Sequence, residues 1–161
     1  MTKHGGVGCY HSLGMEDGRI QDRWISASSY QVYYEPHQAR LHLTSSYKGA
    51  GVWCASYSSN GQYILIDLGN TKKVSGIATQ GMTGIFTPDA WVTSYTIRYS
   101  KYRYYAWRAM YQSFSGNWDC SSSQYNAFDN AITARYIMVM PSRWRQAICM
   151  RIELYGCDAL V

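Results

Sequence analysis

Hydrophobic and polar side chains alternate along several segments of the chain, which is the pattern of a β-strand with one buried face. In residues 94–100, Tyr95, Ile97 and Tyr99 stand between serine, threonine and arginine. In residues 148–155, isoleucine, methionine or leucine occupies every second position, and this is the clearest amphipathic segment. Both segments are therefore predicted to be strands with one face toward the core and one toward water.

Other segments are apolar without alternation, which is typical of strands covered on both faces. Residues 63–68 form such a run, and Gly69-Asn70 directly after it predicts a turn. Residues 72–80 and 135–140 have the same character, and a further strand is expected over residues 104–111. At least six strands separated by turn residues predict an all-β sandwich or barrel.

Three intervals fit no strand pattern. Residues 29–36, 46–52 and 81–89 each mix small or polar residues with isolated large apolar side chains. Loops on an antiparallel scaffold are the usual place for binding residues. The binding function is therefore expected in these three intervals.

Composition supports a β-rich fold and limits the classes of partner. Hydrophobic residues make up 47% of the chain, and 16 of its 161 residues are tyrosine, which suits both strands and recognition loops. The net charge of +5 favours an anionic partner, but no basic run typical of nucleic-acid binding is present. No apolar stretch in the sequence is long enough to cross a membrane.

The length suits one domain, and we expect an N-terminal arm over residues 1–8, the domain over residues 9–157 and a tail over residues 158–161. The first residues lack the apolar core of a secretion signal. If the protein is secreted, such a signal has therefore been removed.

The five cysteines limit the redox compartment and the chemistry; they are Cys9, Cys54, Cys120, Cys149 and Cys157. No two of them have the Cys-x-x-Cys spacing of a zinc or redox motif. An odd number permits two disulfides and a free thiol in several combinations, and Cys9 and Cys157, near the two ends, suggest a bridge that joins the termini. Unpaired thiols in an intracellular protein remain the alternative.

The sequence contains no motif that predicts catalysis. No His-x-Glu, Gly-x-Ser-x-Gly or phosphate-loop pattern occurs, and His4, His11, His37 and His42 belong to no catalytic motif. Cys120, which follows Asp119, could be considered as a nucleophile, but no catalytic motif surrounds it. We therefore expect a non-catalytic binding protein without a cofactor.

A series of short motifs resembles the discoidin domain, also called the coagulation factor five/eight type C domain. The motifs are LGMEDG at 13–18, ISASS at 25–29, QYILIDLG at 62–69, WVTSY at 91–95 and RIELYGC at 151–157. They occur in the order of that family, and the resemblance extends from Cys9 to Cys157. It implies a jelly-roll-like barrel of about eight antiparallel strands with protruding loops, called spikes, at one end.

The resemblance also implies an extracellular place and a Cys9–Cys157 bridge. Members of the family bind phosphatidylserine membranes, collagen, other proteins or galactose-type sugars. The segments around Cys54 and Cys149 resemble those of the discoidin-domain receptor kinases, where the equivalent cysteines are bridged. A Cys54–Cys149 bridge that braces the Cys54 loop, with Cys120 as a free thiol, is therefore implied.

The collagen-binding residues of those kinases are not carried over to this chain. Met82 stands in the third spike where the kinases have an arginine, and Tyr30 stands in the first spike where they have a tryptophan. The expected function is an extracellular recognition or cell-adhesion module that binds a cell-surface ligand through its spikes, first of all an anionic phospholipid membrane. The alternatives are a galactose-type carbohydrate lectin and a protein- or collagen-binding adhesion domain.

The spikes are expected over residues 30–35, 47–53 and 82–88. Their candidate ligand-binding residues are Tyr30, Val32, Tyr33, Tyr34, Tyr47, Lys48, Trp53, Met82, Ile85 and Phe86. Ile85 and Phe86, with Val32 and Tyr33, form an exposed apolar tip in one interpretation and a plug folded over the barrel mouth in the other. A sugar site would use aromatic residues of the same loops together with His37.

Charged residues outside the spikes are expected to have structural roles. Arg40 and Arg135 are predicted to pair with acids such as Asp67 or Glu153 and so to brace the barrel. Asp17 and Asp22 could contribute to a structural calcium site, although turn and capping roles explain them more simply. The low charge and a free Cys120 are compatible with a homo-oligomer.

Overall fold

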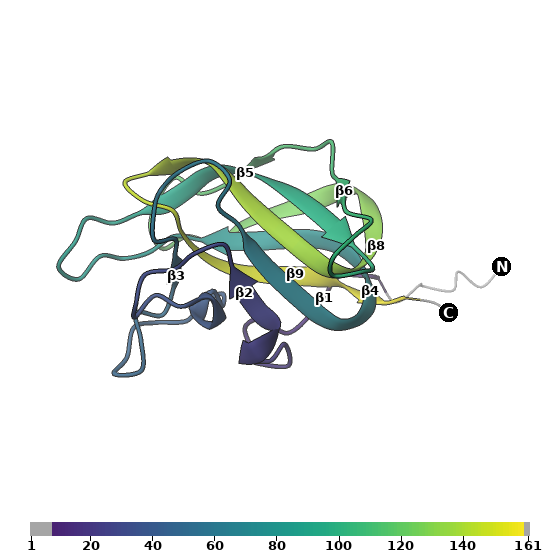
Figure 1. Cartoon of the computed structure of the whole chain (residues 1–161), viewed down its shortest axis with the longest axis horizontal. Helices are drawn as coiled ribbons and strands as arrows, with labels where there is room; N and C mark the ends of the chain where they lie inside the picture. Colours follow the sequence, from purple (N-terminus) through teal and green to yellow (C-terminus); the bar gives the residue numbers. More distant parts are fainter. Residues whose placement is uncertain (1–7, 160–161) are drawn as a thin grey trace.

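The computed structural model describes residues 8–159 and consists almost entirely of antiparallel β-structure (Figure 1). The strands are β1 His11–Ser12, β2 Ile25–Ala27, β3 Trp53–Cys54, β4 Ile64–Gln80, β5 Trp91–Ser100, β6 Arg108–Ala109, β7 Phe114–Ser115, β8 Gln124–Arg145 and β9 Cys149–Asp158. Two short 3-10 helices, η1 Asp22–Trp24 and η2 Pro36–Gln38, interrupt the loops. In the described part of the chain, no helix has the length needed to cross a membrane.

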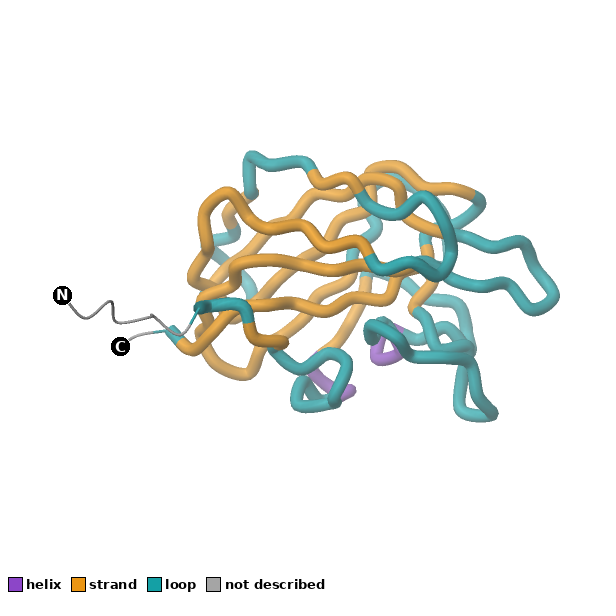
Figure 2. Tube along the Cα trace, turned by 180° about the vertical axis from the view of Figure 1, so that it is seen from behind, coloured by secondary structure: helices purple, strands orange, loops and turns teal. Residues whose placement is uncertain are grey.

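The four long strands β4, β5, β8 and β9 form the body of the barrel. The strands follow the order β1-β9-β4-β8-β5-β6, while β2 pairs with β4, β3 with β9 and β7 with β5. Each of these strand pairs is antiparallel. The tube in Figure 2 shows the sheet curving on itself, with several of the long loops at the end away from the termini. The predicted all-β jelly-roll-type fold is therefore confirmed.

The predicted turn at Gly69-Asn70 is wrong, because both residues lie within β4, a strand of 17 residues. Gly69 has a φ of 81°, and the pairing of β4 with β8 changes register between Asp67 and Lys72. Glycine adopts this left-handed backbone without a Cβ clash, so the chain bends here and stays in the sheet. The apolar runs over residues 63–68 and 72–80 are thus two halves of one bent strand.

The predicted strand over residues 94–100 is confirmed as part of β5, with Tyr95 and Ile97 buried. The strand predicted over residues 148–155 corresponds to β9, but its second face is not wet. Arg151 and Glu153 are buried as well as the apolar set, since loops from the N-terminal third of the chain cover that face. The alternation correctly predicted a strand, but the side chains at its polar positions, Arg151 and Glu153, form hydrogen bonds inside the protein.

The strand predicted over residues 104–111 is also wrong in extent. Only Arg108 and Ala109 form a strand, β6, which pairs with Arg98 and Tyr99 of β5. Residues 101–107 form an exposed loop in which Ala106 has a φ of 57°. Tyr104, Tyr105 and Tyr111 of this segment are exposed to solvent, so the strand preference of tyrosine was misleading here.

Ion pairs and hydrogen bonds brace the barrel partly as predicted. Arg135 pairs with Asp67, at 2.9 Å from Nε to Oδ1. Arg40, however, donates to Asp22 at 2.6 Å and to the Met15 carbonyl at 2.7 Å, and not to Glu153. The pairing expected for Arg135 is present, whereas Arg40 ties η1 to the turn before it.

Two disulfides join the pairs that the resemblance implies, Cys9–Cys157 and Cys54–Cys149. They are attached at opposite ends of β9, because Cys149 begins that strand and Cys157 lies one residue before its end. Cys54 pairs in register with Cys149 across β3 and β9, and both are buried. The second disulfide therefore lies inside the base of the loop region and not on an outer surface.

We expect one thiol per chain when the denatured, unreduced protein reacts with a thiol reagent, and five after reduction. Cys120 is the free cysteine of the structure, and the other four are held in disulfides. A count of five thiols before reduction would contradict both disulfides.

Candidate loop-tip binding site

The three loop intervals predicted to bind lie together at one end of the barrel. The predicted intervals 29–36, 46–52 and 81–89 fall largely within three loops of the structure: loop A, residues 28–35, loop B, residues 43–52, and loop C, residues 81–90 (Figure 1). β9 runs from this end, where Cys149 lies, to the other end at Cys157. The loops are therefore separated from the Cys9–Cys157 disulfide by the length of the barrel.

Loops A and B are held to each other by hydrogen bonds. The Tyr33 hydroxyl donates to the Ser46 carbonyl at 2.6 Å, and the Ala50 amide donates to the Tyr33 carbonyl at 2.9 Å. Tyr33 itself has a φ of 81°, a conformation that non-glycine residues rarely adopt. Such backbone positions cluster at binding sites, where surrounding contacts hold them in place.

A buried amide, Gln38, connects the same two loops from below. Its Nε2 donates to the Tyr33 carbonyl at 2.8 Å and to Glu35 at 2.7 Å, while its Oε1 accepts from the Gly51 amide at 2.7 Å. Gly51 has a φ of 75°, and a Cβ there would lie 2.4 Å from the carbonyl carbon of Thr44. The conformation of loop B therefore requires glycine at position 51.

A small apolar cluster supports the loops and includes several predicted site residues. Val52, Met82 and Ala90 pack around the Cys54–Cys149 disulfide, and Tyr34 packs against this group. Trp53 belongs to the main core, where its indole Nε1 donates to the Ser29 carbonyl at 3.0 Å. Trp53 and Met82 are buried and Tyr34 is partly buried, so these three side chains support the loops and present little or no surface to a ligand.

The apolar tip is exposed and does not plug the barrel. Phe86 is 99% exposed, Val32 86% and Ile85 64%, whereas Tyr33 is 43% exposed because its hydroxyl is engaged by loop B. Large apolar side chains this exposed have no packing role in the folded chain. The plug interpretation is therefore excluded for Val32, Ile85 and Phe86.

Loop B adds an aromatic and a cationic side chain to the same end. Tyr47 is 90% exposed, and the Lys48 ammonium lies 5.8 Å from the centre of its ring. Tyr30 of loop A is also exposed. The loop end of the barrel thus exposes apolar side chains and, on loop B, a positive charge.

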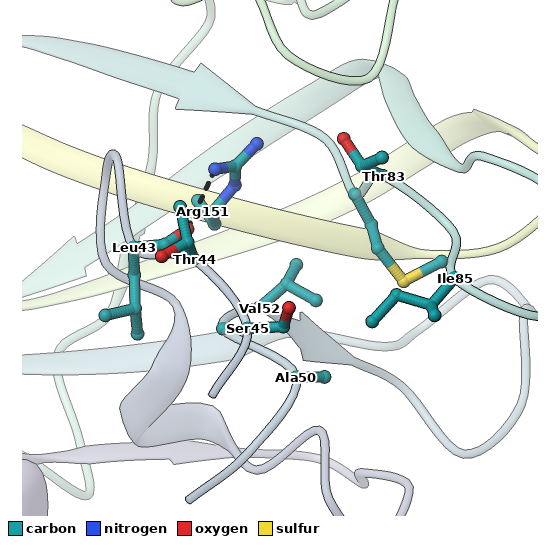
Figure 3. A pocket seen from close by; sticks show the side chains of 10 residues that line it. Leu43, Thr44, Ser45, Ala50, Val52, Thr83, Ile85 and Arg151 are labelled. Atoms are coloured by element: carbon teal, nitrogen blue, oxygen red, sulfur yellow. Dashed lines mark hydrogen bonds between the residues drawn. The ribbon is translucent and has the colours of Figure 1, made fainter. Parts of the chain in front are cut away.

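A pocket of about 210 Å³ lies between loops B and C (Figure 3). The hydroxyl residues Thr44, Ser45 and Thr83 line it together with Val52 and Ile85. Arg151 lies on its inner wall. The pocket therefore places polar groups directly beside the exposed Ile85.

The Arg151 guanidinium is the buried cation of this site. Nε, Nη1 and Nη2 donate to the carbonyls of Gly81, Leu43 and Cys120 at 2.8, 2.9 and 3.1 Å. No carboxylate of the described residues forms an ion pair with it. Burial lowers the pKa of Arg151, but an arginine stays protonated at neutral pH, so the inner wall is positive.

Sequence reasoning missed Gln38 and Arg151, although both organise the loops. Arg151 occupies a polar position of an alternating strand, and the pattern alone predicted a solvated side chain there. Nothing in the motif RIELYGC, which begins at Arg151, indicates that carbonyl groups from three distant loops accept hydrogen bonds from its guanidinium. For Gln38, no signal in the sequence distinguishes a buried amide from a surface one.

The acidic residues considered for calcium are engaged by arginines. Asp17 pairs with Arg19 at 2.7 Å and also accepts from the Arg19 amide, and Asp22 pairs with Arg40 at 2.6 Å. Across residues 8–159, no group of three or more histidine, cysteine or acidic side chains is arranged to hold a metal ion. These contacts give Asp17 the turn role considered in the sequence analysis.

Comparison with known proteins identifies the class of fold and site. The model of the F5/8 type C domain family matches residues 25–154. Coagulation factor V of Mus musculus is 37% identical and that of Homo sapiens 36%, each over 94% of this chain. The chain spans 7% of the length of these relatives.

Solved structures agree with this assignment. Wild-type discoidin II from Dictyostelium discoideum is 25% identical with a TM-score of 0.75, covering 84% of this chain and 55% of that one. A family 32 carbohydrate-binding module from C. perfringens, solved in complex with galactose, is 17% identical with a TM-score of 0.64, covering 85% of this chain and 97% of that one. The barrel with loops at one end is that of a discoidin-type binding module. The chain belongs to the F5/8 type C, or discoidin, domain family.

Proposed function

We propose that this chain is an extracellular recognition module whose loops A, B and C bind an anionic phospholipid surface. The observation that carries the proposal is the exposure of Val32, Ile85 and Phe86 at the loop end of the barrel, where Lys48 of loop B is exposed as well. Bare aliphatic and phenyl groups gain free energy on leaving water, and a cation near the membrane plane attracts anionic headgroups. The two disulfides support an oxidising, extracellular environment.

The pocket between loops B and C gives the proposal a place for a headgroup. Arg151 makes its inner wall positive, and Thr44, Ser45 and Thr83 supply hydroxyl groups at its rim. With Ile85 and Phe86 in the hydrocarbon, the pocket would lie at the level of the lipid headgroups. An anionic headgroup would then take part of the charge that no carboxylate of the protein balances.

The expected affinity of one domain is modest. Burying two large apolar side chains contributes about 3–6 kcal/mol, and one lysine near an anionic surface adds about 1 kcal/mol. Part of this is offset by the loss of translational and rotational freedom on binding. Firm attachment would therefore need several such domains acting together.

Vesicle co-sedimentation tests the proposal. We expect the wild-type chain to sediment with vesicles of phosphatidylserine and phosphatidylcholine, and not with vesicles of phosphatidylcholine alone. Added salt should weaken binding, because it screens the attraction of Lys48 and Arg151 to the surface. Equal binding to both kinds of vesicle, or to neither, would contradict the proposal.

A carbohydrate ligand at the same end is the second candidate. The pocket carries three hydroxyl residues and an arginine beside apolar groups, which is a lining that could hold a small saccharide. The galactose complex of the family 32 carbohydrate-binding module shows that a relative in fold binds a sugar. A galactose-bearing resin that retains the chain, with free galactose eluting it, would favour this candidate, provided that vesicles fail to bind.

A further inference from the structure

The loop over residues 101–111 exposes a second, different group of aromatic side chains. Tyr104 is 85% exposed, Tyr105 63%, Tyr102 48%, and Tyr111 is fully exposed. Every large hydrophobic side chain that is exposed in this loop is a tyrosine, so each ring carries a hydroxyl. This composition differs from the phenyl and aliphatic tip of loops A and C.

The same segment is positively charged without any acidic residue. Between Asp89 and Asp119 the chain contains Arg98, Lys101, Arg103 and Arg108, but no aspartate or glutamate. All four cations are exposed, and none of them takes part in the ion pairs formed among residues 8–159. Four unpaired cations on one segment create a local positive field that suits a polyanion.

The loop is held in place by its own contacts. Ser100 accepts from the Tyr102 amide at 2.9 Å and donates to the Tyr105 carbonyl at 2.9 Å. The rings of Tyr102 and Tyr105 stack at 4.7 Å, and the Arg103 guanidinium lies 5.8 Å from the centre of the Tyr104 ring. A loop fixed in this way loses little conformational entropy when it binds.

A recess of about 530 Å³ lies between this loop and the middle of β8. Tyr99 and Ile132 form its apolar part, Asn130 and Thr133 offer polar groups, and Lys101 and Arg108 stand at its walls. A second recess of about 240 Å³ continues from it past Tyr111 and includes Asp129. The two recesses share Tyr99, Asn130 and Ile132, so they form one groove.

This groove lies at the far end of β5 from loop C. β5 begins at Trp91, next to loop C, and ends at Ser100, where the tyrosine loop starts (Figure 1). Ten residues of strand span about 33 Å. A ligand in the groove would therefore leave loops A, B and C free for their own partner.

We propose that the groove and the tyrosine loop bind a sulfated polysaccharide chain, at a site separate from the loop tip. Sulfate groups accept charge-assisted hydrogen bonds from arginine and lysine, while tyrosine faces and hydroxyls provide a surface for sugar rings. A repeating anionic chain in the groove would contact Lys101 and Arg108, and Arg103 beside Tyr104 offers a further cation on the loop. A membrane is a poorer match, because the exposed side chains carry hydroxyls and no bare aliphatic or phenyl group.

Binding of heparin oligosaccharides, measured by calorimetry at moderate ionic strength, tests the proposal. We expect the wild-type chain to bind, and the Arg103→Ser/Arg108→Ser variant to bind about tenfold or more weakly, since two charge-assisted contacts are lost. The Arg143→Ser/Arg145→Ser variant is the matched control, because it removes the same charge from exposed positions at the loop C end of β8. It should retain heparin binding within about twofold.

Further measurements separate this proposal from the proposed membrane function. The Arg103→Ser/Arg108→Ser variant should keep the wild-type melting temperature and its binding to phosphatidylserine vesicles. Absence of heparin binding, an equal loss in the control variant, or equally tight binding of poly-glutamate would overturn the proposal. Loss of vesicle binding in the Arg103→Ser/Arg108→Ser variant would also overturn it, because the surface would then face the membrane.

Discussion

Replacing both apolar residues of loop C, in an Ile85→Ser/Phe86→Ser variant, is expected to weaken binding to phosphatidylserine vesicles by about 100-fold or more. The two side chains are 64% and 99% exposed in the free protein, so their burial takes place only on binding. Serine removes that gain while leaving the backbone of the loop unchanged. Co-sedimentation over a range of lipid concentrations measures the change.

The matched control removes two exposed side chains of similar size from the other end of the barrel. A Tyr104→Ser/Tyr111→Ser variant loses rings that are 85% and fully exposed, and it should bind vesicles as the wild type does. Both variants should melt at the wild-type temperature, because neither removes a core contact. Equal weakening in the two variants would mean that loop C has no special part in membrane binding.

Replacing Glu153 is expected to have the largest effect on stability. Its carboxylate is 1% exposed and accepts hydrogen bonds from the amides of Gly14, Met15, Glu16 and Leu154 at 3.3, 3.1, 2.9 and 2.9 Å. A Glu153→Leu variant leaves these amides without an acceptor and should lose more than about 3 kcal/mol of unfolding free energy.

Graded variants distinguish this role from a simple loss of charge. Glu153→Gln keeps one oxygen for the amides and should lose less than Glu153→Leu does. Glu16→Gln, at an exposed glutamate that pairs with His42 at 2.8 Å, should change stability by about 1 kcal/mol or less. Urea unfolding of the three variants measures the series. A Glu153→Leu variant as stable as the wild type would show that the amides find other partners.

The strands of this protein could be predicted from the sequence where periodicity and burial agree. Tyr95 and Ile97 alternate with polar residues and are buried, so the pattern identified β5 directly. The prediction was wrong at Gly69 because a glycine with positive φ marks either a turn or a bend within a strand. Only the pairing of β4 with β8 and β9 on both sides of it decides between the two.

The tyrosine-rich segment over residues 104–111 shows a different limit. Tyrosine has a high strand preference, but it also suits exposed recognition surfaces, and local sequence does not distinguish the two. The structure places Tyr104 and Tyr105 in an exposed loop and limits β6 to Arg108 and Ala109. Residues that were wrongly predicted to form a strand therefore form part of the second proposed binding surface.

The candidate site was predicted in its position and only partly in its residues. Glycines and isolated apolar residues correctly located loops A, B and C, and Phe86 and Val32 are exposed as the tip interpretation requires. Trp53 lies in the core because β3 pairs with β9, a contact between residues 97 positions apart that local sequence does not show. Arg151 was missed for the same reason, since its three acceptors come from three distant segments.

The structure thus gives one small barrel two different exposed surfaces. The loop end exposes apolar side chains together with Lys48 of loop B, and the groove at the far end of β5 is aromatic and cationic. A module built in this way could contact a membrane at one end and an anionic polymer at the other.

Insertion of loop C into the bilayer is the central claim, and depth-dependent fluorescence quenching tests it most directly. A Phe86→Trp variant, bound to phosphatidylserine vesicles with brominated acyl chains, should be quenched more strongly than the wild type under the same conditions. The difference isolates position 86 from the native tryptophans. Unchanged quenching in a variant that still binds the vesicles would contradict the account, because the chain would then contact the membrane through another surface.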